Sequence, residues 1–185
     1  MPPTFVFVRH GEAEHNVEFM KEGEDGYKNP KYKDSRLTEV GVEQALQTKE
    51  HLSHISFLEV WSSPLNRCIQ TAMCINNDNK MIFLHDSLIE RLGGGHVCNE
   101  RKAKTEINSE YPNCSTIFLP HSPPIWVERE RNSSVYFRVF GFLALLRELY
   151  KNNPKTDYIL LVTHHDVIEA LLGMSLKNGE YVFVE

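Results

Sequence analysis

The stretch Thr4-Phe5-Val6-Phe7-Val8-Arg9-His10-Gly11 decides the fold. Its first five residues are β-branched or aromatic and show no polar alternation, which is typical of a strand buried on both faces. A second stretch, Ile159-Leu160-Leu161-Val162-Thr163-His164-His165, has the same form and also ends in histidine. Ligands in open α/β sheets bind outside the carboxyl ends of the strands. If the two strands are parallel neighbours, we therefore expect His10 and His164 to face one crevice.

The rest of the chain alternates between strand-like and helix-like segments, which predicts an α/β fold. Further strands are expected at Phe57–Trp61, at Met81–Leu84, in the centre at Tyr158–Val162, and at the edge at Tyr181–Val184. A helix is expected from the N-cap Thr38 to His54, with Ala45 and Leu46 facing inward. A second helix is expected after the N-cap Ser63, with Pro64 in its first position. Two more are expected at Ser134–Tyr150 and at His165–Leu172.

Two segments break this alternation. The polar stretch from Glu18 to Lys33 predicts a surface excursion. The stretch from Leu92 to Glu130 contains three consecutive glycines and several prolines, so loops and short helices are expected there. We interpret it as a lid or rim at about residues 92–130 of a single domain that spans residues 1–185.

Composition excludes several classes of protein. The chain has 185 residues, with 20 Lys and Arg against 25 Asp and Glu, a net charge of -5. One domain is the expectation for this length, and the acidic balance argues against nucleic-acid binding. No apolar run approaches the roughly 20 residues of a membrane span, and no export signal is evident. The four cysteines form no C-x-x-C pair, so we expect reduced thiols in the cytoplasm.

The residues at the two strand ends suit a phosphoryl group. Ser62-Ser63-Pro64-Leu65-Asn66-Arg67 follows another strand, which places Arg67 in the first turn of a helix. Together with Arg9 it supplies two fork-shaped cations, and each charge-assisted hydrogen bond contributes about 1.5–3 kcal/mol. A neutral imidazole can attack phosphorus and form a covalent intermediate. The guanidiniums and the second imidazole would stabilise the oxygens, so no metal is required.

Four blocks in this order resemble the histidine phosphatase (phosphoglycerate mutase-like) superfamily, in its mutase/phosphatase branch. They are Arg9-His10-Gly11-Glu12 with Asn16, Leu37-Thr38-x-x-Gly41-x-x-Gln44-Ala45, Ser62-Ser63-Pro64-Leu65-x-Arg67-x-x-Gln70-Thr71-Ala72, and Val162-Thr163-His164. A looser similarity, to a plant and fungal mutase-like subgroup, is carried by Asn16-Val17, Glu90, His96-Val97-Cys98-Asn99-x-Arg101 and Tyr111-Pro112. The resemblance implies a three-layer α/β/α fold around a mostly parallel sheet.

The resemblance also implies roles for individual residues. His10 would be the nucleophile that becomes phosphohistidine. Arg9, Arg67 and His164 would line the phosphate pocket, and Asn16 would be a further hydrogen-bond donor to the substrate.

Glu90 occupies the position of the family's proton donor, which protonates the leaving oxygen and then activates water. The sequence departs from the family at His165, which stands where glycine is usual and would crowd the pocket or change its charge. His165-Asp166 also imitates the His-Asp pair of the acid-phosphatase branch, in which the aspartate is the donor. We reject that register because the strand ends at Thr163-His164 and because Asn16 fits the other branch.

The expected function is therefore a metal-independent phosphatase that hydrolyses a small phosphomonoester through His10 and needs no cofactor. The short chain, and Glu12 where glycolytic mutases have serine, favour a phosphatase. A phosphoglycerate mutase-type phosphotransferase and a catalytically silent phosphate-binding module are the alternatives.

Two further groups of residues are candidates for binding a metal ion or a second anionic group. His164-His165-Asp166 are adjacent and cannot easily converge on one ion, and no H-E-x-x-H motif is present, so no metal site is expected. Four cations either bind a second anionic group of the substrate or form a solvated surface: Arg91, Arg101, Lys102 and Lys104.

Overall fold

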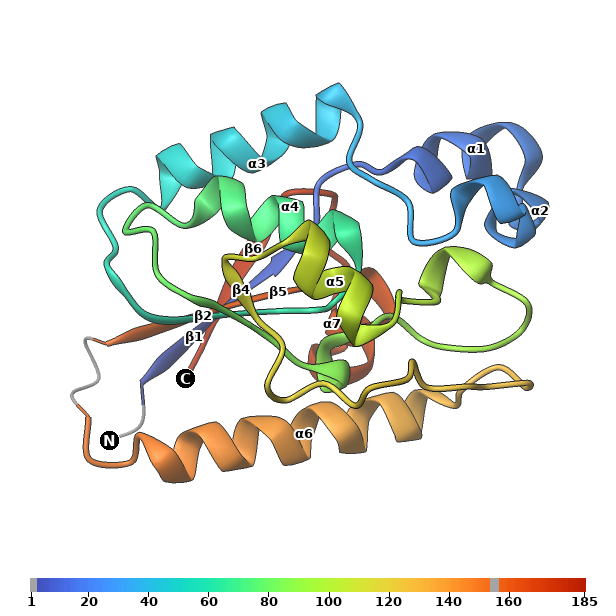
Figure 1. The fold of residues 1–185 in the computed structure, drawn as a ribbon. Coiled ribbons are helices and arrows are strands. Elements are labelled where there is room, and N and C mark those ends of the chain that lie inside the picture. Colours follow the sequence, from blue (N-terminus) through green and yellow to red (C-terminus); the bar gives the residue numbers. More distant parts are fainter. Residues whose placement is uncertain (1–2, 154–156) are drawn as a thin grey trace.

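The computed structural model, which describes residues 3–153 and 157–185, is built around a six-stranded sheet in the order β4-β3-β2-β5-β1-β6 (Figure 1). All neighbouring strands are parallel except β6, which pairs antiparallel with β1. The elements are β1 (Thr4–Arg9), α1 (Glu14–Glu22), α2 (Glu24–Lys28), η1 (Pro30–Tyr32), α3 (Glu39–His51), β2 (Phe57–Ser62), α4 (Asn66–Ile75), β3 (Ile82–Leu84), η2 (Asp86–Leu88), η3 (Val97–Asn99), α5 (Lys104–Glu110), β4 (Cys114–Ser115), α6 (Asn132–Leu149), β5 (Tyr158–Thr163), α7 (His165–Leu172) and β6 (Tyr181–Val184).

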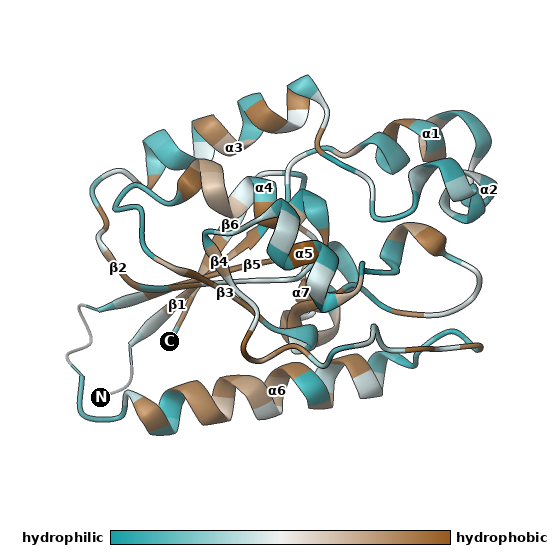
Figure 2. Ribbon diagram, in the orientation of Figure 1, coloured by the Kyte–Doolittle hydropathy of each residue, from teal (hydrophilic) through white to brown (hydrophobic). Residues whose placement is uncertain are grey.

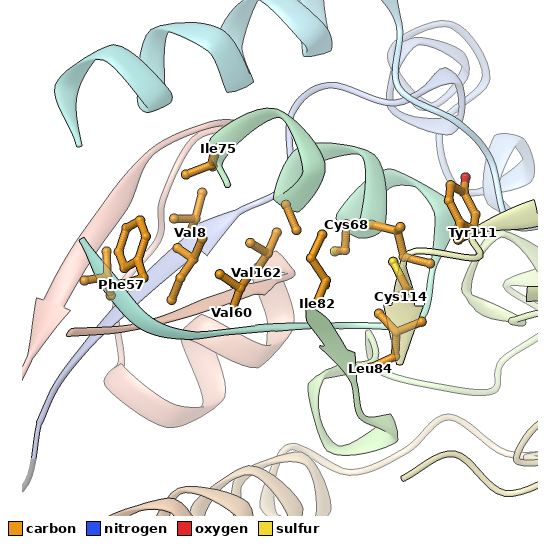
Figure 3. Packing of buried hydrophobic residues seen from close by; sticks show 14 of the residues in the cluster. Val8, Phe57, Val60, Cys68, Ile75, Ile82, Leu84, Tyr111, Cys114 and Val162 are labelled. Carbon is orange, nitrogen blue, oxygen red and sulfur yellow. The ribbon is translucent and has the colours of Figure 1, made fainter. Parts of the chain in front are cut away.

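Helices cover both faces of the sheet, so the predicted three-layer α/β/α fold is confirmed. Successive side chains of a strand point to opposite faces, and the core is accordingly divided in two. On one face Val8 and Val162 pack with Cys68 and Ile75 of α4 (Figure 3). On the other face Phe7 and Leu161 pack with α6 and α7. Hydropathy follows this arrangement, with apolar strands in the middle and polar residues concentrated in α1 and α2 (Figure 2).

Most expected elements are present, with corrections at some boundaries. Thr38 caps α3 by accepting a hydrogen bond from the backbone N–H of Gly41, as predicted. Leu46 was wrongly placed on the inner face: it is 48% exposed, because α3 buries Ala45 and Thr48 instead. The surface excursion predicted from Glu18 to Lys33 contains the end of α1, α2 and η1, and the short edge strand β4 was not predicted.

The start of α4 also differs from the prediction. The helix begins at Asn66 rather than at Pro64, with Leu65 in the N-cap position. Ser63 does not cap it because its hydroxyl lies 2.7 Å from Nε2 of His164. The carboxylate of Asp34 accepts the hydrogen bond from the N–H of Asn66 at 2.8 Å and satisfies the helix terminus in its place.

The 92–130 segment contains η3, α5, β4 and long connections, and buried ion pairs hold it to the rest of the molecule. Arg101 is 1% exposed and donates to both carboxylate oxygens of Asp86, at 2.8 and 3.0 Å, and to the carbonyl of Pro120. At the base, Leu92 and Glu130 exchange hydrogen bonds. No helix in the described part of the chain is long and apolar enough to cross a bilayer.

Candidate active site

The rings of His10 and His164 meet at the carboxyl end of the sheet. β1 and β5 are parallel neighbours with Arg9 opposite Thr163, so the next residue of each strand emerges at the same edge. The ring centroids are 5.1 Å apart and the rings are nearly perpendicular, at 63°. Both side chains are buried. The arrangement expected from the two strand ends is therefore the one in the structure.

The hydrogen bonds of His10 define which ring nitrogen is free. Nδ1 lies 2.7 Å from the carbonyl oxygen of Gly11, which can only accept, so Nδ1 carries the hydrogen and Nε2 keeps its lone pair. Burial first, and then the charges of Arg67 and Arg9, lower the pKa of His10 well below its usual value. The ring is therefore neutral near pH 7, with Nε2 as a nucleophile.

Two glycines allow the close packing that fixes the turn after His10. A Cβ atom added to Gly11 would overlap the carbonyl oxygen of Gly41, and one added to Gly41 would overlap that of Glu12. The N–H of Gly11 donates to Oγ1 of Thr71 at 3.1 Å. A glycine is thus required at position 41, in the block that begins at Leu37, because it contacts the turn after His10 directly.

The two predicted arginines differ in how they are held. Arg67 is completely buried and donates from Nε to Nε2 of His10 at 3.3 Å, from Nη1 to the carbonyl of Cys98, and from Nη2 to Oδ1 of Asn99. Arg9 donates from Nη1 to the carbonyl of Leu176 at 2.7 Å. Its Nε is buried and has no hydrogen-bond partner among the described residues, so it is a donor available to an anion.

The side chain of His164 is held by one residue that precedes α4 and by one residue of α4. Its Nε2 lies 2.7 Å from the hydroxyl of Ser63 and 3.3 Å from Sγ of Cys68. Burial first, followed by Arg67 and His10, lowers the pKa of His164 well below its usual value. The second imidazole is therefore also neutral.

Glu90 follows the short helix η2, and neighbouring elements hold the loop that carries it. Thr163 donates from Oγ1 to the carbonyl of Leu88 at 2.8 Å, and Arg138 donates to the carbonyl of Ser87 at 2.6 Å. Burial first, and then the negative charge of Asp166, raise the pKa of Glu90 to about 7. Near neutral pH this carboxyl group can both hold and release a proton.

Asp166, the second carboxylate at the site, has different partners. Its Oδ2 lies 3.1 Å from Nε of Arg91 and 3.0 Å from Nη2 of Arg129. Two guanidiniums thus hold Asp166, whereas the carboxylate of Glu90 accepts from the N–H of Arg91 at 2.8 Å. The raised pKa of Glu90 makes it a carboxyl group that can carry a proton near neutral pH.

These groups surround a polar cavity of about 100 Å³, which we call the phosphate cavity. Its lining consists of Arg9, His10, His15, Asn16, Tyr27, Glu90, His96, Cys98, Asn99, Arg129, His165 and Asp166. Five of the seven predicted site residues are among them. The other two, Arg67 and His164, are fully buried against the ring of His10.

Asn16 lines the cavity through a network that the sequence did not reveal. Its Oδ1 accepts from the N–H of Ala13 at 3.0 Å, and its Nδ2 lies 3.2 Å from Nε2 of His15. His15 in turn is buried, with Nδ1 2.6 Å from the hydroxyl of Ser35. His15 therefore orients the amide of Asn16, and its position beside Asn16 in the motif was the available signal.

Several other lining residues were missed. His96 and Asn99 belong to the looser matched block, which offered a signal for them. Tyr27 lies in the excursion assigned to the surface, and Arg129 stands at the end of the 92–130 segment without any motif. Arg129 donates to Nδ1 of His96 at 2.7 Å as well as to Asp166. These contacts depend on the folded chain and have no counterpart in local sequence patterns.

The four cations proposed for a second anionic group are all engaged elsewhere. Arg91 contacts Asp166 and Asn132, and Arg101 contacts Asp86. Lys102 pairs with Glu110, and Lys104 donates to the carbonyl of Leu119. None of the four lines the phosphate cavity, and each contacts a partner elsewhere in the protein.

Among the described residues, one group of side chains has the spacing of metal ligands. His165, Asp166 and Glu169 each offer a ligand atom, and these atoms lie within 4.8 Å of one another. The helical repeat of α7, rather than adjacency in sequence, brings Glu169 beside the other two. A cation there would have to compete with the guanidiniums of Arg91 and Arg129 for Asp166.

Comparison with known proteins agrees with the motifs and the fold. Residues 5–181 match the model of the histidine phosphatase superfamily (branch 1). The 2,3-bisphosphoglycerate-dependent phosphoglycerate mutase of Thermoplasma acidophilum is 28% identical, over 95% of this chain and 77% of the mutase. The uncharacterized phosphatase PhoE of Bacillus subtilis is also 28% identical, over 89% of this chain and 73% of its own.

Solved structures show the same fold at lower identity. A mycobacterial glucosyl-3-phosphoglycerate phosphatase in complex with VO3 aligns with a TM-score of 0.66 and 20% identity, over 99% of this chain and 92% of its own. Bacillus stearothermophilus YhfR aligns with a TM-score of 0.68 and 19% identity, over 99% and 91% of the two chains.

Proposed function

We propose that this chain, which belongs to branch 1 of the histidine phosphatase superfamily, is a cytoplasmic, metal-independent phosphatase that hydrolyses a small phosphomonoester through a phosphohistidine on His10. The cytoplasm is favoured by its four free cysteines. The observation that carries the proposal is the state of His10. A buried, neutral imidazole has its Nδ1 hydrogen committed to Gly11 and its Nε2 turned toward the guanidinium of Arg67.

The first chemical step transfers the phosphoryl group to the protein. The lone pair of Nε2 of His10 attacks phosphorus while the bond to the ester oxygen breaks, and Glu90 gives its proton to the departing alcohol. Arg9, Arg67, His164 and the amide of Asn16 stabilise the phosphoryl oxygens. Among these donors, Nε of Arg9 is buried and without a partner among the described residues before the substrate arrives, so it needs little reorganisation in the transition state.

The second step returns the protein to its starting state. The carboxylate of Glu90 takes a proton from a water molecule, whose oxygen attacks phosphorus as the bond to Nε2 of His10 breaks. Inorganic phosphate leaves, and Glu90 again carries a proton. The same group can serve both steps because its pKa of about 7 lies near the operating pH. His165, in place of the usual glycine, lies at the rim of the phosphate cavity and adds an imidazole there.

Hydrolysis of p-nitrophenyl phosphate by the wild type and by His10→Ala tests the proposal. The wild type should release phosphate in the presence of EDTA, and the variant should not. Rapid quenching with a radiolabelled phosphate ester should give an acid-labile label on the wild type alone. Undiminished turnover by a folded His10→Ala protein would refute the role of His10. A strict requirement for added metal would refute the mechanism.

The similarity to a phosphoglycerate mutase supports one alternative, a phosphotransferase that retains the phosphohistidine long enough to rephosphorylate a product. Incubation of 3-phosphoglycerate with 2,3-bisphosphoglycerate separates the two activities, because only a mutase forms 2-phosphoglycerate. A catalytically silent phosphate-binding module would bind phosphate but would show no acid-labile label in the quench experiment.

A further inference from the structure

The size of the phosphate cavity limits what it can hold. At about 100 Å³ it has the volume of roughly three water molecules, which suits a phosphoryl group and little more. The alcohol portion of a phosphomonoester must therefore lie outside it. Where that portion goes decides which esters the protein accepts.

A second cavity, of about 280 Å³, adjoins the first and shares the side chain of His96 with it. We call it the lid cavity. Much of its wall is apolar and comes from the 92–130 segment, including Leu92 and the run from Pro123 to Val127. Apolar walls beside a polar phosphate site are typical of a pocket that binds the organic part of a ligand.

The apolar side chains of this wall are left open to solvent. Ile125 and Val127 are 88% exposed, and Trp126 is 46% exposed. The nearby backbone is nevertheless held in place, because Arg101 donates to the carbonyls of Pro120 and Ser122 at 3.0 Å. The exposed apolar run thus directly follows an anchored stretch of the chain, and a ligand seated in the lid cavity would cover part of it.

The charges around the two cavities oppose a second acidic group on the substrate. Arg129 is held by Asp166 at 3.0 Å, and Arg101 by Asp86 at 2.8 Å. Lys33 on the rim of the lid cavity pairs with Glu100 at 3.2 Å. A carboxylate or a second phosphate would have to compete with Asp166, Asp86 or Glu100 for these cations, whereas a hydrocarbon group would leave the pairs intact.

We propose that the lid cavity binds an apolar alcohol portion of the substrate, so that the preferred phosphomonoesters have a hydrophobic leaving group rather than a second anionic group. This inference rests on the proposed function, because it presumes that the phosphoryl group lies against His10. It names the substrate class of that same site.

Binding of alkylphosphonic acids, which cannot be hydrolysed, tests the inference without requiring turnover. Calorimetry on the whole chain would compare ethylphosphonic, n-hexylphosphonic and 6-phosphonohexanoic acids. We expect n-hexylphosphonic acid to bind at least about tenfold more tightly than ethylphosphonic acid, because four more methylenes leave water. The carboxylate of 6-phosphonohexanoic acid should cancel most of that gain.

Substitutions in the lid cavity test whether the higher affinity for n-hexylphosphonic acid arises there. Trp126→Ala and Ile125→Ser should each reduce the hexyl-to-ethyl affinity ratio several-fold. Phe137→Ala removes an aromatic side chain that is 68% exposed on α6 and lines neither cavity, so it should keep the wild-type ratio. Circular dichroism would verify that each variant is folded.

The outcomes distinguish this inference from the proposed function. Equal affinities for the two alkylphosphonates, a ratio unchanged in both lid-cavity variants, or tighter binding of the carboxylate compound would overturn the inference and leave the His10 chemistry standing. Loss of the acid-labile label would instead refute the proposed function, and the phosphonate ratio would still report on the lid cavity. No binding of any phosphonate would overturn the inference.

Discussion

Glu90→Gln should separate esters according to whether their leaving group needs a proton. Glutamine keeps the shape of the side chain and can still accept from the N–H of Arg91, but it cannot supply a proton. General acid catalysis contributes about 10²–10⁴-fold, so kcat for an alkyl phosphate should fall by that factor. p-Nitrophenolate leaves without protonation, and the first step with its phosphate ester should be affected far less.

The pH dependence gives the same prediction a second readout. With a pKa of about 7, Glu90 is about half protonated at pH 7 and about 1% protonated at pH 9. The kcat/KM of the wild type for an alkyl phosphate should therefore fall about tenfold per pH unit above neutrality. His10 adds no loss between pH 6 and 7, because burial and two guanidiniums keep its pKa well below its usual value.

The assay is phosphate release from n-butyl and p-nitrophenyl phosphate between pH 5 and 9, corrected for the ester's own ionisation near pH 6. Asp166→Asn is the matched variant: removal of its negative charge lowers the pKa of Glu90, so the decline should begin at lower pH. Equal losses for both esters in burst-phase measurements on Glu90→Gln would refute the reasoning. Loss of alkyl turnover in Asp166→Asn alone would make Asp166 the donor.

Two other substitutions, and a stability measurement on Glu90→Gln, test the supports of the site. Gly41→Ala should destabilise the protein by about 1–3 kcal/mol and reduce kcat/KM, because the new methyl group overlaps the carbonyl of Glu12 beside the turn after His10. Thermal melts would measure the loss of stability, and p-nitrophenyl phosphate turnover would measure the loss of activity. Arg101→Met should cost about 3 kcal/mol or more in urea unfolding, since it leaves the carboxylate of Asp86 without its partner. Glu90→Gln should raise the unfolding free energy at pH 8 by up to about 3 kcal/mol and not at pH 4. The reason is that burial penalises the ionised carboxylate of Glu90, which predominates at pH 8, whereas the protonated form predominates at pH 4. Equal melting shifts at both pH values would contradict this.

The parts of this molecule that could be predicted from sequence are those with short-range causes. A buried strand has a continuous apolar run, and the strand ends at Arg9 and Thr163 were visible because the run stops there. The N-cap of α3 was predictable because a threonine hydroxyl bonds within three residues. The meeting of His10 and His164 was expected on the condition that β1 and β5 are parallel neighbours, and the register shows that they are.

The predictions that failed involve partners far apart in the chain. Ser63 has the right chemistry for a helix cap, but His164, about a hundred residues away, takes its hydroxyl, and Asp34 caps α4 instead. Arg129 reaches Asp166 across 37 residues without any motif around it. Tyr27 was assigned to the surface, although the fold brings it to the phosphate cavity. Such pairings depend on tertiary contacts that local patterns do not encode.

The burial of Arg67 has a consequence for how the protein recognises an anion. Its guanidinium loses its hydration shell when the chain folds, and its three nitrogens donate instead to His10, Cys98 and Asn99, none of which carries a negative charge. Burial of this uncompensated charge lowers the stability of the unliganded protein. A bound anion that offsets the charge should therefore raise the melting temperature. At an inorganic phosphate concentration a hundred times its dissociation constant, the linkage adds about 2.7 kcal/mol to the unfolding free energy. The burial of Arg67 thus affects both the stability of the free protein and its affinity for phosphate.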